Sequence, residues 1–387
     1  MHKLLDLSKE ALQNQLSLST LEEIVQQPTV WVEAYEMLVE RQEEIKLFLS
    51  KIDQDTRIIF TGAGSSAYVG DMCAPWLTKH IGRQFESIAT TDIVSAPNTY
   101  LESETKTILV SFGRSGNSPE SVAAYEVAEQ VVQDLSHIII TCNKDGALSV
   151  RGEENERALV FNLPAATHDR GFAMTSSFST MMFSALCIFQ AERLVEMKQD
   201  VLTVSNAVDH LIKENHNEIH SLSKENVERV VYLGSGELKG IAQECSLKFL
   251  ELTAGDIMAT FETPLGFRHG PKSLINNNTC TIVCISNDSY TKQYDLDIVR
   301  ELVSQKRSDR VVSLGFDREN LGEDNRFIFS KEAEHVTNLP VLSFLYVVWG
   351  QLLSFYTSFE RGVTVDNPCP TGEVNRVVQG VTIYPLK

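Results

Sequence analysis

The chain has 387 residues, 43% of them hydrophobic, which is enough for two or three domains with sizeable cores. Its 52 acidic and 34 basic residues leave a formal net charge of -18, which argues against nucleic acid and anionic membrane surfaces as partners. The seven cysteines are scattered and form no Cys-x-x-Cys pair, so neither a disulfide framework nor a zinc site is indicated. Acidic residues come too early for a secretory signal, and no run reaches about 18 apolar residues, so we expect a cytoplasmic protein without a membrane span.

Residues 1–50 have the pattern of a helical leader. Ser19 and Thr20 offer a hydroxyl cap, and acidic residues follow in the next turn. After Pro28, apolar residues recur at helical spacing as far as Leu49. We expect a pair of helices that packs on the following domain or on another subunit.

Short apolar strands and helices then alternate, and the pattern occurs twice. Arg57–Gly64 is a buried strand running into a glycine turn, and Arg229–Gly236 has the same sequence pattern. Two further strands and a long apolar helix follow each copy at similar offsets: Thr107–Val110 with Thr281–Cys284, His137–Ile140 with Arg310–Val312, and Phe178–Leu194 with Val341–Phe359. The alternation predicts an α/β protein with two tandem doubly wound parallel-sheet domains, at 51–205 and 220–365, followed by a tail at 366–387.

Three loops of the first copy carry hydroxyl groups where a strand or loop leads into a helix. They are Gly62–Ser66, Gly113–Glu120, which adds the guanidinium of Arg114, and Thr175–Thr180. Ligands of open parallel sheets bind outside the carboxyl ends of the strands, and helix N-termini attract anions. Each loop alone could equally be an ordinary capped helix, but three in one copy favour an anion site. The second copy has Glu237 and Asp288 at the corresponding places, which would repel phosphate.

The second copy offers a different set of groups. Glu244, Lys248 and Glu251 lie within an arc of about 60° on the predicted helix Leu238–Leu252. By periodicity alone, a solvated salt-bridging face is the favoured interpretation. His269 follows in a loop with Gly270 and Pro271, where a histidine is usually structural or on the surface.

A carboxylate and a histidine near one sugar phosphate are nevertheless the groups that aldose–ketose isomerisation needs. One opens the sugar ring, and the other carries a proton between C2 and C1. No His or Cys cluster has metal-ligand spacing, and neither the dinucleotide fingerprint nor the P-loop is present. We therefore expect no metal and no other cofactor.

Taken together, these motifs resemble the sugar isomerase (SIS) family, over about residues 50–387. The resemblance extends to the isomerase half of glucosamine-6-phosphate synthase, and it implies flavodoxin-like SIS domains. Gly64, Ser65 and Ser66 are similar to the first phosphate loop of the family, Arg114, Ser115 and Ser118 to its second, and Ser176 to a residue of its third substrate loop. Glu251 matches the proton-transfer glutamate, Glu244 and Lys248 its supporting residues, and His269 the ring-opening histidine. In relatives this histidine comes from a neighbouring subunit, which implies a homodimer or a larger homo-oligomer with shared sites.

The differences from the synthase narrow the resemblance. We expect no glutaminase domain before the first copy. Gln379 stands where the synthase has a substrate-binding lysine, and Arg376 could compensate for that change. Both residues lie in the tail, which we expect to close the site. The segment His168–Ser177 and the residues around His269 look most like the galactosamine-6-phosphate deaminase/isomerases, also called tagatose-6-phosphate ketose/aldose isomerases. Three other functions stay open: isomerisation of neutral sugar phosphates, deglycation of phosphorylated sugar–amine adducts, and sensing of a sugar phosphate without catalysis.

Overall fold

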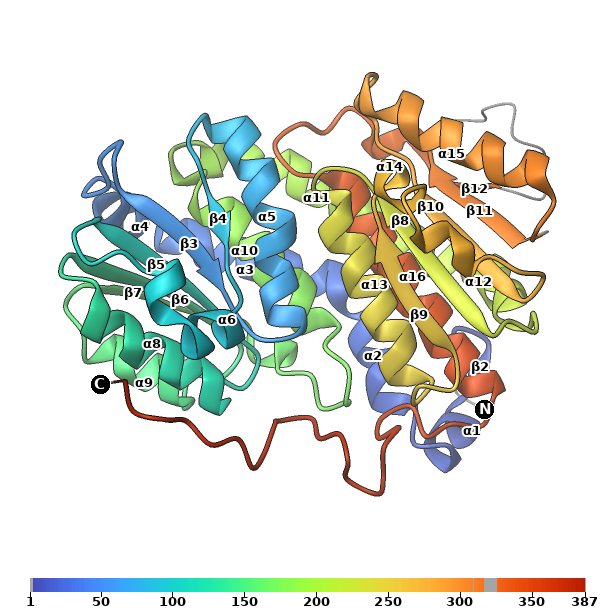
Figure 1. Ribbon diagram of the computed structural model, residues 1–387, viewed down its shortest axis with the longest axis horizontal. Helices are drawn as coiled ribbons and strands as arrows, with labels where there is room; N and C mark the ends of the chain where they lie inside the picture. Colours follow the sequence, from blue (N-terminus) through green and yellow to red (C-terminus); the bar gives the residue numbers. More distant parts are fainter. Residues whose placement is uncertain (1–2, 309, 317–325, 387) are drawn as a thin grey trace. The chain divides into compact units, whose positions relative to one another are not determined.

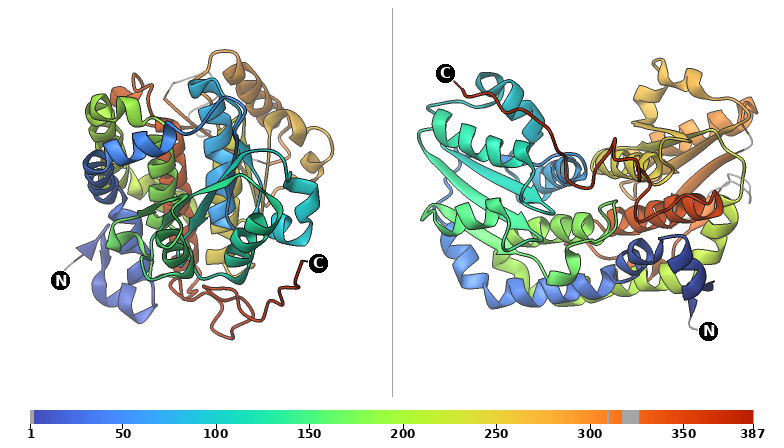
Figure 2. Two further views of the ribbon diagram at one scale, coloured as in Figure 1. Left: turned by 90° about the vertical axis from the view of Figure 1, so that its left-hand side faces the viewer. Right: turned by 90° about the horizontal axis from the view of Figure 1, so that it is seen from below.

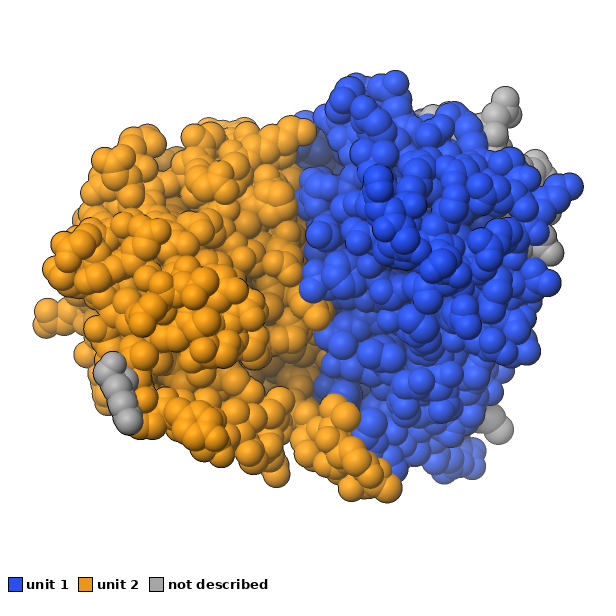
Figure 3. Space-filling view, viewed as in Figure 1, with its two compact units in different colours: residues 1–28, 170–173, 202–370 blue, residues 29–169, 174–201, 371–387 orange. Residues whose placement is uncertain are grey.

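The computed structural model describes residues 3–308, 310–316 and 326–386. The chain divides into two compact units, each assembled from separate stretches of sequence (Figure 3). Unit 1 contains residues 1–28, 170–173 and 202–370, and unit 2 contains residues 29–169, 174–201 and 371–387. The leader is therefore shared: its first part belongs to unit 1 and the remainder to unit 2.

Unit 2 is built on a sheet of five parallel strands (Figure 1). Their order across the sheet is β4-β3-β5-β6-β7, which is the 2-1-3-4-5 order of flavodoxin-like sheets. The central strands are apolar on both faces, as expected for a parallel sheet covered on both sides. The strands are β3 (Arg57–Thr61), β4 (Glu86–Ser87), β5 (Thr107–Gly113), β6 (Leu135–Thr141) and β7 (Ala158–Asn162).

Helices cover both faces of this sheet. One face carries α6 and α8, whose apolar residues form a core with Ile59 and Leu109. On the other face, α5 and α10 pack together, and Phe60 contacts Phe112 and Phe189 there. The helices are α3 (Gln27–Glu40), α4 (Gln42–Leu49), α5 (Ser65–Ile81), α6 (Thr90–Ser95), α7 (Pro97–Tyr100), α8 (Pro119–Val131), α9 (Ala147–Glu153), η1 (Ala165–Thr167), α10 (Ser176–Ile188) and η2 (Ala191–Met197).

Unit 1 contains a second parallel sheet with the same strand order, β9-β8-β10-β11-β12. A core cluster joins its strands to the apolar face of α15, and α13 and α16 pack against each other. The strands are β8 (Arg229–Gly234), β9 (Met258–Glu262), β10 (Thr279–Cys284), β11 (Arg310–Gly315) and β12 (Arg326–Ile328). The helices are α1 (Lys9–Asn14), α2 (Leu18–Val25), α11 (Lys198–Glu214, which begins in unit 2), α12 (His216–Ser223), α13 (Leu238–Leu252), α14 (Pro264–Phe267), η3 (Pro271–Leu274), α15 (Thr291–Gln305), η5 (Lys331–Ala333) and α16 (Val341–Glu360).

The last helix, α16, is long and apolar enough to cross a membrane by length and composition alone. Every residue of its apolar stretch is buried inside the protein, so in this fold α16 is a core helix. Gly350 allows the close approach of α13, because a Cβ at this position would lie 2.4 Å from the Sγ of Cys245.

The α/β class and the two parallel sheets are confirmed, with five strands in each sheet instead of the three predicted. The prediction of a helix pair in the leader was wrong in detail. A small hairpin of β1 (Lys3–Leu4) and β2 (Leu7–Ser8) comes first, and four helices follow it. The first predicted long helix also ends earlier, at Ile188, where a 3-10 segment replaces it. Figure 2 shows the tail after Pro370 as an extended ribbon without helix or strand.

Candidate active site

The first predicted phosphate loop is the tight turn between β3 and α5. A Cβ at Gly62 would lie 2.5 Å from the backbone of Ser66, so only glycine allows the helix to begin so close to the strand. Gly64 caps α5 with a φ of 56° and a ψ of -130°, a combination that is open essentially to glycine alone. Ser65 and Ser66 are buried in the first turn of α5, where backbone N–H groups favour an anion.

The second loop leaves β5 and is braced from the end of β6. The side chain of Asn143 donates to the carbonyl of Ser115 at 2.9 Å, and Thr141 Oγ1 donates to the carbonyl of Gly113 at 2.7 Å. Ser118 precedes α8, and its hydroxyl donates to the hydroxyl of Ser121 at 2.6 Å. Arg114 is buried, an environment in which a guanidinium needs partners. This loop therefore has a fixed backbone and carries a buried cation.

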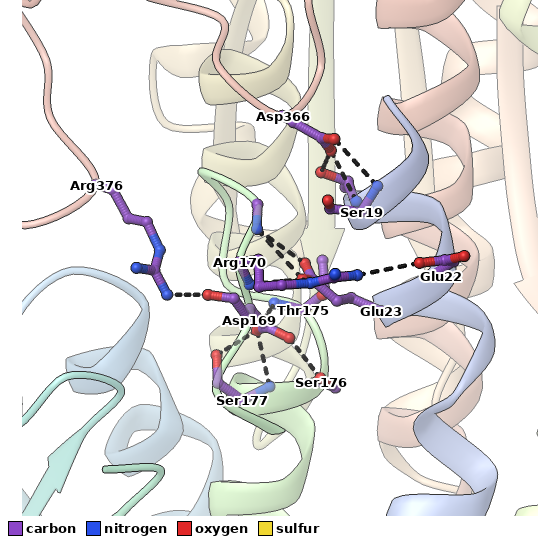
Figure 4. Close-up of polar contacts among 12 residues, drawn as sticks. Ser19, Glu22, Glu23, Asp169, Arg170, Thr175, Ser176, Ser177, Asp366 and Arg376 are labelled. Carbon is purple, nitrogen blue, oxygen red and sulfur yellow. Dashed lines mark hydrogen bonds and ion pairs between the residues drawn. The ribbon is translucent and has the colours of Figure 1, made fainter. Parts of the chain in front are cut away.

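The third loop is held by a residue that precedes it and that the sequence analysis did not single out. Asp169 is fully buried, and its carboxylate accepts hydrogen bonds from the backbone N–H groups of Thr175 and Ser177, at 2.8 and 2.9 Å (Figure 4). It also accepts from the hydroxyls of Ser176 and Ser177. The first turn of α10 is therefore capped by an anion of the chain itself. The hydroxyl proton of Ser176 points to Asp169, and its role toward a substrate stays a prediction.

The tail is tied to the second and third loops within unit 2. The guanidinium of Arg114 donates to the backbone carbonyl of Arg376 at 2.8 Å, and the guanidinium of Arg376 donates to the carbonyl of Asp169 (Figure 4). The pKa of the neighbouring His168 is lowered by burial, then by the positive charges of Arg376 and Arg114. Gln379 is exposed further along the tail. Arg114 and Arg376 thus bring two positive charges to the predicted phosphate loops, and they favour the neutral form of His168.

Within unit 1, carboxylates hold the chain that continues from Asp169. Glu23 on α2 is buried and accepts from the backbone N–H groups of Arg170 and Gly171 (Figure 4). Asp366 accepts from the backbone N–H groups of Ser19 and Thr20, at 3.0 and 2.8 Å. Within unit 1 the leader therefore supports Arg170 and Gly171, a role that its helical pattern alone did not predict.

The predicted catalytic trio lies on α13 in unit 1. Glu244 and Lys248 are buried, with side-chain exposures of 0% and 1%, so the alternative of a solvated salt-bridging face is wrong. The Nζ of Lys248 lies 3.5 Å from Glu244 Oε1 and also pairs with Glu251, whose side chain is 24% exposed. Lys248 thus links the buried carboxylate of Glu244 to the partly exposed carboxylate of Glu251. Burial of this kind is costly and is typical of functional groups.

His269 lies in the same unit, in the turn between α14 and η3. Its side chain is exposed, and within residues 3–308, 310–316 and 326–386 it has no hydrogen bond to the α13 trio. Gly270 has a φ of 128°, and a Cβ there would meet nothing within 4 Å, so the backbone angle and not space requires glycine. In the part of the chain that the structure describes, no group of three or more His, Cys, Asp or Glu side chains is arranged to hold a metal ion.

Comparison with known proteins places these features in a family. The SIS domain family matches residues 51–191. The D-galactosamine-6-phosphate deaminase AgaS of Shewanella sp. (strain ANA-3) is 43% identical over 98% of this chain and 95% of its own length. The chain belongs to the AgaS family of SIS-domain proteins. A crystal structure of tagatose-6-phosphate ketose/aldose isomerase from Escherichia coli is 38% identical to this AgaS-family chain, with a TM-score of 0.87 over 95% of this chain and 96% of that one.

A more distant structural similarity supports only the fold of the AgaS-family chain. The C-terminal domain of glucosamine-fructose-6-phosphate aminotransferase from Francisella tularensis is 18% identical, with a TM-score of 0.74 over 90% of this chain and 97% of that one. The SIS match covers the sheet of unit 2, and the sheet of unit 1 shares its strand order.

Proposed function

We propose that this chain is a cytoplasmic, homo-oligomeric enzyme of amino-sugar catabolism that converts galactosamine 6-phosphate to tagatose 6-phosphate and ammonia. The names of relatives at about 40% identity over nearly the whole chain support this function. The observation that carries it is the Glu244–Lys248–Glu251 cluster, because a sugar-phosphate sensor has no need for buried charges on α13. Each of the two sheets belongs to an SIS domain in this proposal, one domain at 51–205 and one at 220–365.

Unit 2 binds the 6-phosphate of the substrate. Ser65 and Ser66 offer donors at the start of α5, and Ser115 and Ser118 offer donors before α8. Arg114 supplies the positive charge that the acidic chain as a whole lacks. Its bond to the carbonyl of Arg376 supports this assignment, because that bond holds the guanidinium beside the second loop.

The reaction needs one ring-opening group and one proton carrier. His269 opens the pyranose ring by moving a proton between the C1 hydroxyl and the ring oxygen. The carboxylate of Glu251 removes the C2 proton, giving an enolamine, and returns a proton to C1, giving a 2-imino sugar. Water adds to the imine, and ammonia leaves with the ketose 6-phosphate. Lys248 orients the Glu251 carboxylate, and Glu244 balances the charge of the lysine.

The test is ammonia release from galactosamine 6-phosphate and glucosamine 6-phosphate, measured for the wild type, Glu251→Gln and Glu225→Gln. Glu225 pairs with Arg310 at 2.8 Å in the same unit, so its variant is a matched loss of one carboxylate. We expect ammonia from the galacto epimer, abolished by Glu251→Gln and kept by Glu225→Gln. A fully active Glu251→Gln enzyme would remove Glu251 from the mechanism.

A second function is favoured by the Escherichia coli relative that is named a tagatose-6-phosphate ketose/aldose isomerase. The same proton transfer on a neutral sugar phosphate passes through an enediol and releases no ammonia. Conversion of tagatose 6-phosphate to an aldose, with no ammonia from either amino sugar, would establish this function in place of the first.

A further inference from the structure

One carboxylate on α15 binds both of the cations that flank His269. The Oε2 of Glu301 accepts from Arg268 Nε at 2.7 Å, and its Oε1 accepts from Lys272 Nζ. Arg268 immediately precedes the histidine and Lys272 follows three residues after it. All three side chains are largely shielded from solvent, with exposures between 22% and 27%. The two ends of the His269 loop (residues 268–272) are therefore fastened to one point of a helix.

The elements on either side of the loop make this anchor effective. Phe267 is fully buried in the core cluster that includes Leu296, Val299 and Leu302 of α15. Beyond the loop, the N–H of Ser273 donates to the carbonyl of Gly270 at 3.0 Å. The imidazole of His269 is exposed, and among the described residues Glu301 is the one side chain of α15 that bonds to both ends of the loop.

We propose that Glu301 is a positioning residue for His269, because it fastens both ends of the loop that carries the imidazole. This rests on the ring-opening role proposed for His269. The pKa of Glu301 is lowered by its bonds to Lys272 and then Arg268, so the carboxylate stays ionised under working conditions.

The other charged groups that face the loop do less. Asp297 on α15 contacts only Arg268, at 3.0 Å, and its side chain is 70% exposed, so solvent screens it. Glu262, at the end of β9, accepts from the backbone N–H of Thr263, which is the N-cap residue of α14, and within the described part of the chain it has no hydrogen bond to either flanking cation. Gln305 donates to Glu301 Oε1 at 3.3 Å and adds no charge. Among these groups, Glu301 alone bridges both flanking cations.

The test follows the His269 imidazole directly. Histidine labelled with 13C at Cε1 is observed by NMR, and His269 is assigned from its missing signal in His269→Gln. In Glu301→Gln we expect the His269 signal to change its chemical shift and linewidth because the loop has lost its anchor, whereas Glu225→Gln, with the same change in net charge, leaves both unchanged. Asp297→Asn should change them less than Glu301→Gln does.

Kinetics supply the second readout. With a positioning role, Glu301→Gln lowers kcat/KM by roughly tenfold to a hundredfold and leaves the inhibition constant of inorganic phosphate within about twofold. Glu301→Asp keeps the charge but is too short to bridge both cations, so it also loses rate, and it replaces Glu301→Gln in the test if that variant does not fold. An unchanged His269 signal together with a wild-type kcat/KM in a folded variant would overturn the proposal. If the wild type releases no ammonia, the proposed function fails, and the NMR comparison still decides the role of Glu301.

Discussion

Replacing Lys248 with methionine removes the cation from the buried cluster on α13 while nearly conserving side-chain length and shape. Glu244 lies 3.5 Å from the lysine and is fully buried, whereas the partly exposed Glu251 can be compensated by water. At an effective dielectric constant of about 20, the attraction lost at that distance is about 5 kcal/mol. The variant no longer buries a lysine charge, which offsets part of this loss. Removing one partner of a buried pair typically costs about 3–5 kcal/mol, and we expect a destabilisation in that range.

The assay is equilibrium urea unfolding followed by the fluorescence of Trp349, the tryptophan of unit 1, which is buried on α16. The double variant Lys248→Met with Glu244→Gln removes both buried charges, so it should recover most of the loss. A loss below about 1 kcal/mol for Lys248→Met, or a double variant no better than the single one, would refute the reasoning. Either result would mean that the two charges are not buried together in solution.

Three further outcomes follow from particular contacts. Gly64→Ala should lower the free energy of unfolding by about 1–3 kcal/mol and weaken phosphate binding, because the cap angles of α5 suit only glycine. Equilibrium unfolding measures the stability, and phosphate titration measures the affinity. An unchanged phosphate affinity would contradict the assignment of the first phosphate loop. Gly350→Ala should cost about 1–3 kcal/mol by crowding Cys245, and adding Cys245→Ala should restore part of that stability; no rescue would point to strain elsewhere. The pKa of His168 is lowered from its ordinary value of 6.5, so below that pH the unfolded chain binds more protons and stability falls as pH falls. His168→Gln should flatten the stability curve between about pH 5 and 6.5 relative to the wild type, and identical curves would show that His168 is not buried beside the arginines.

Local sequence patterns located the parts of the fold that depend on neighbouring residues. The central strands are mostly apolar runs, β3 and β8 lead into glycine turns, and the α13 trio follows from helical spacing. Among the described residues of the two parallel sheets, four strands were missed. Three of them have weak signals, because β4 has two residues, β12 has three, and β9 is a partly exposed edge strand. The fourth, β7, is a short apolar run at the sheet edge that the sequence analysis passed over. The leader hairpin turns at Leu5 and Asp6, which have positive φ without a glycine to signal it.

The remaining features depend on contacts between distant segments. Spacing placed Glu244 and Lys248 on one face of a helix, but it gave no sign that this face is buried. Asp169 caps α10 from six residues before Thr175, outside any local capping pattern, so the sequence alone does not indicate its role. Its hydrogen bond to the tail joins residues 207 positions apart, a distance at which sequence spacing carries no information.

The division of unit 1 between both ends of the chain has a consequence for synthesis on the ribosome. Gln27 donates to Gln351, 324 residues away, and α2 packs on α16. The apolar side chains of Leu21 and Ile24 are fully buried in the folded protein, but their partners are translated near the end of the chain. Unit 2 has most of its residues available much earlier. Helix α2 therefore leaves the ribosome long before its partner α16, and its apolar face needs protection from aggregation during that interval.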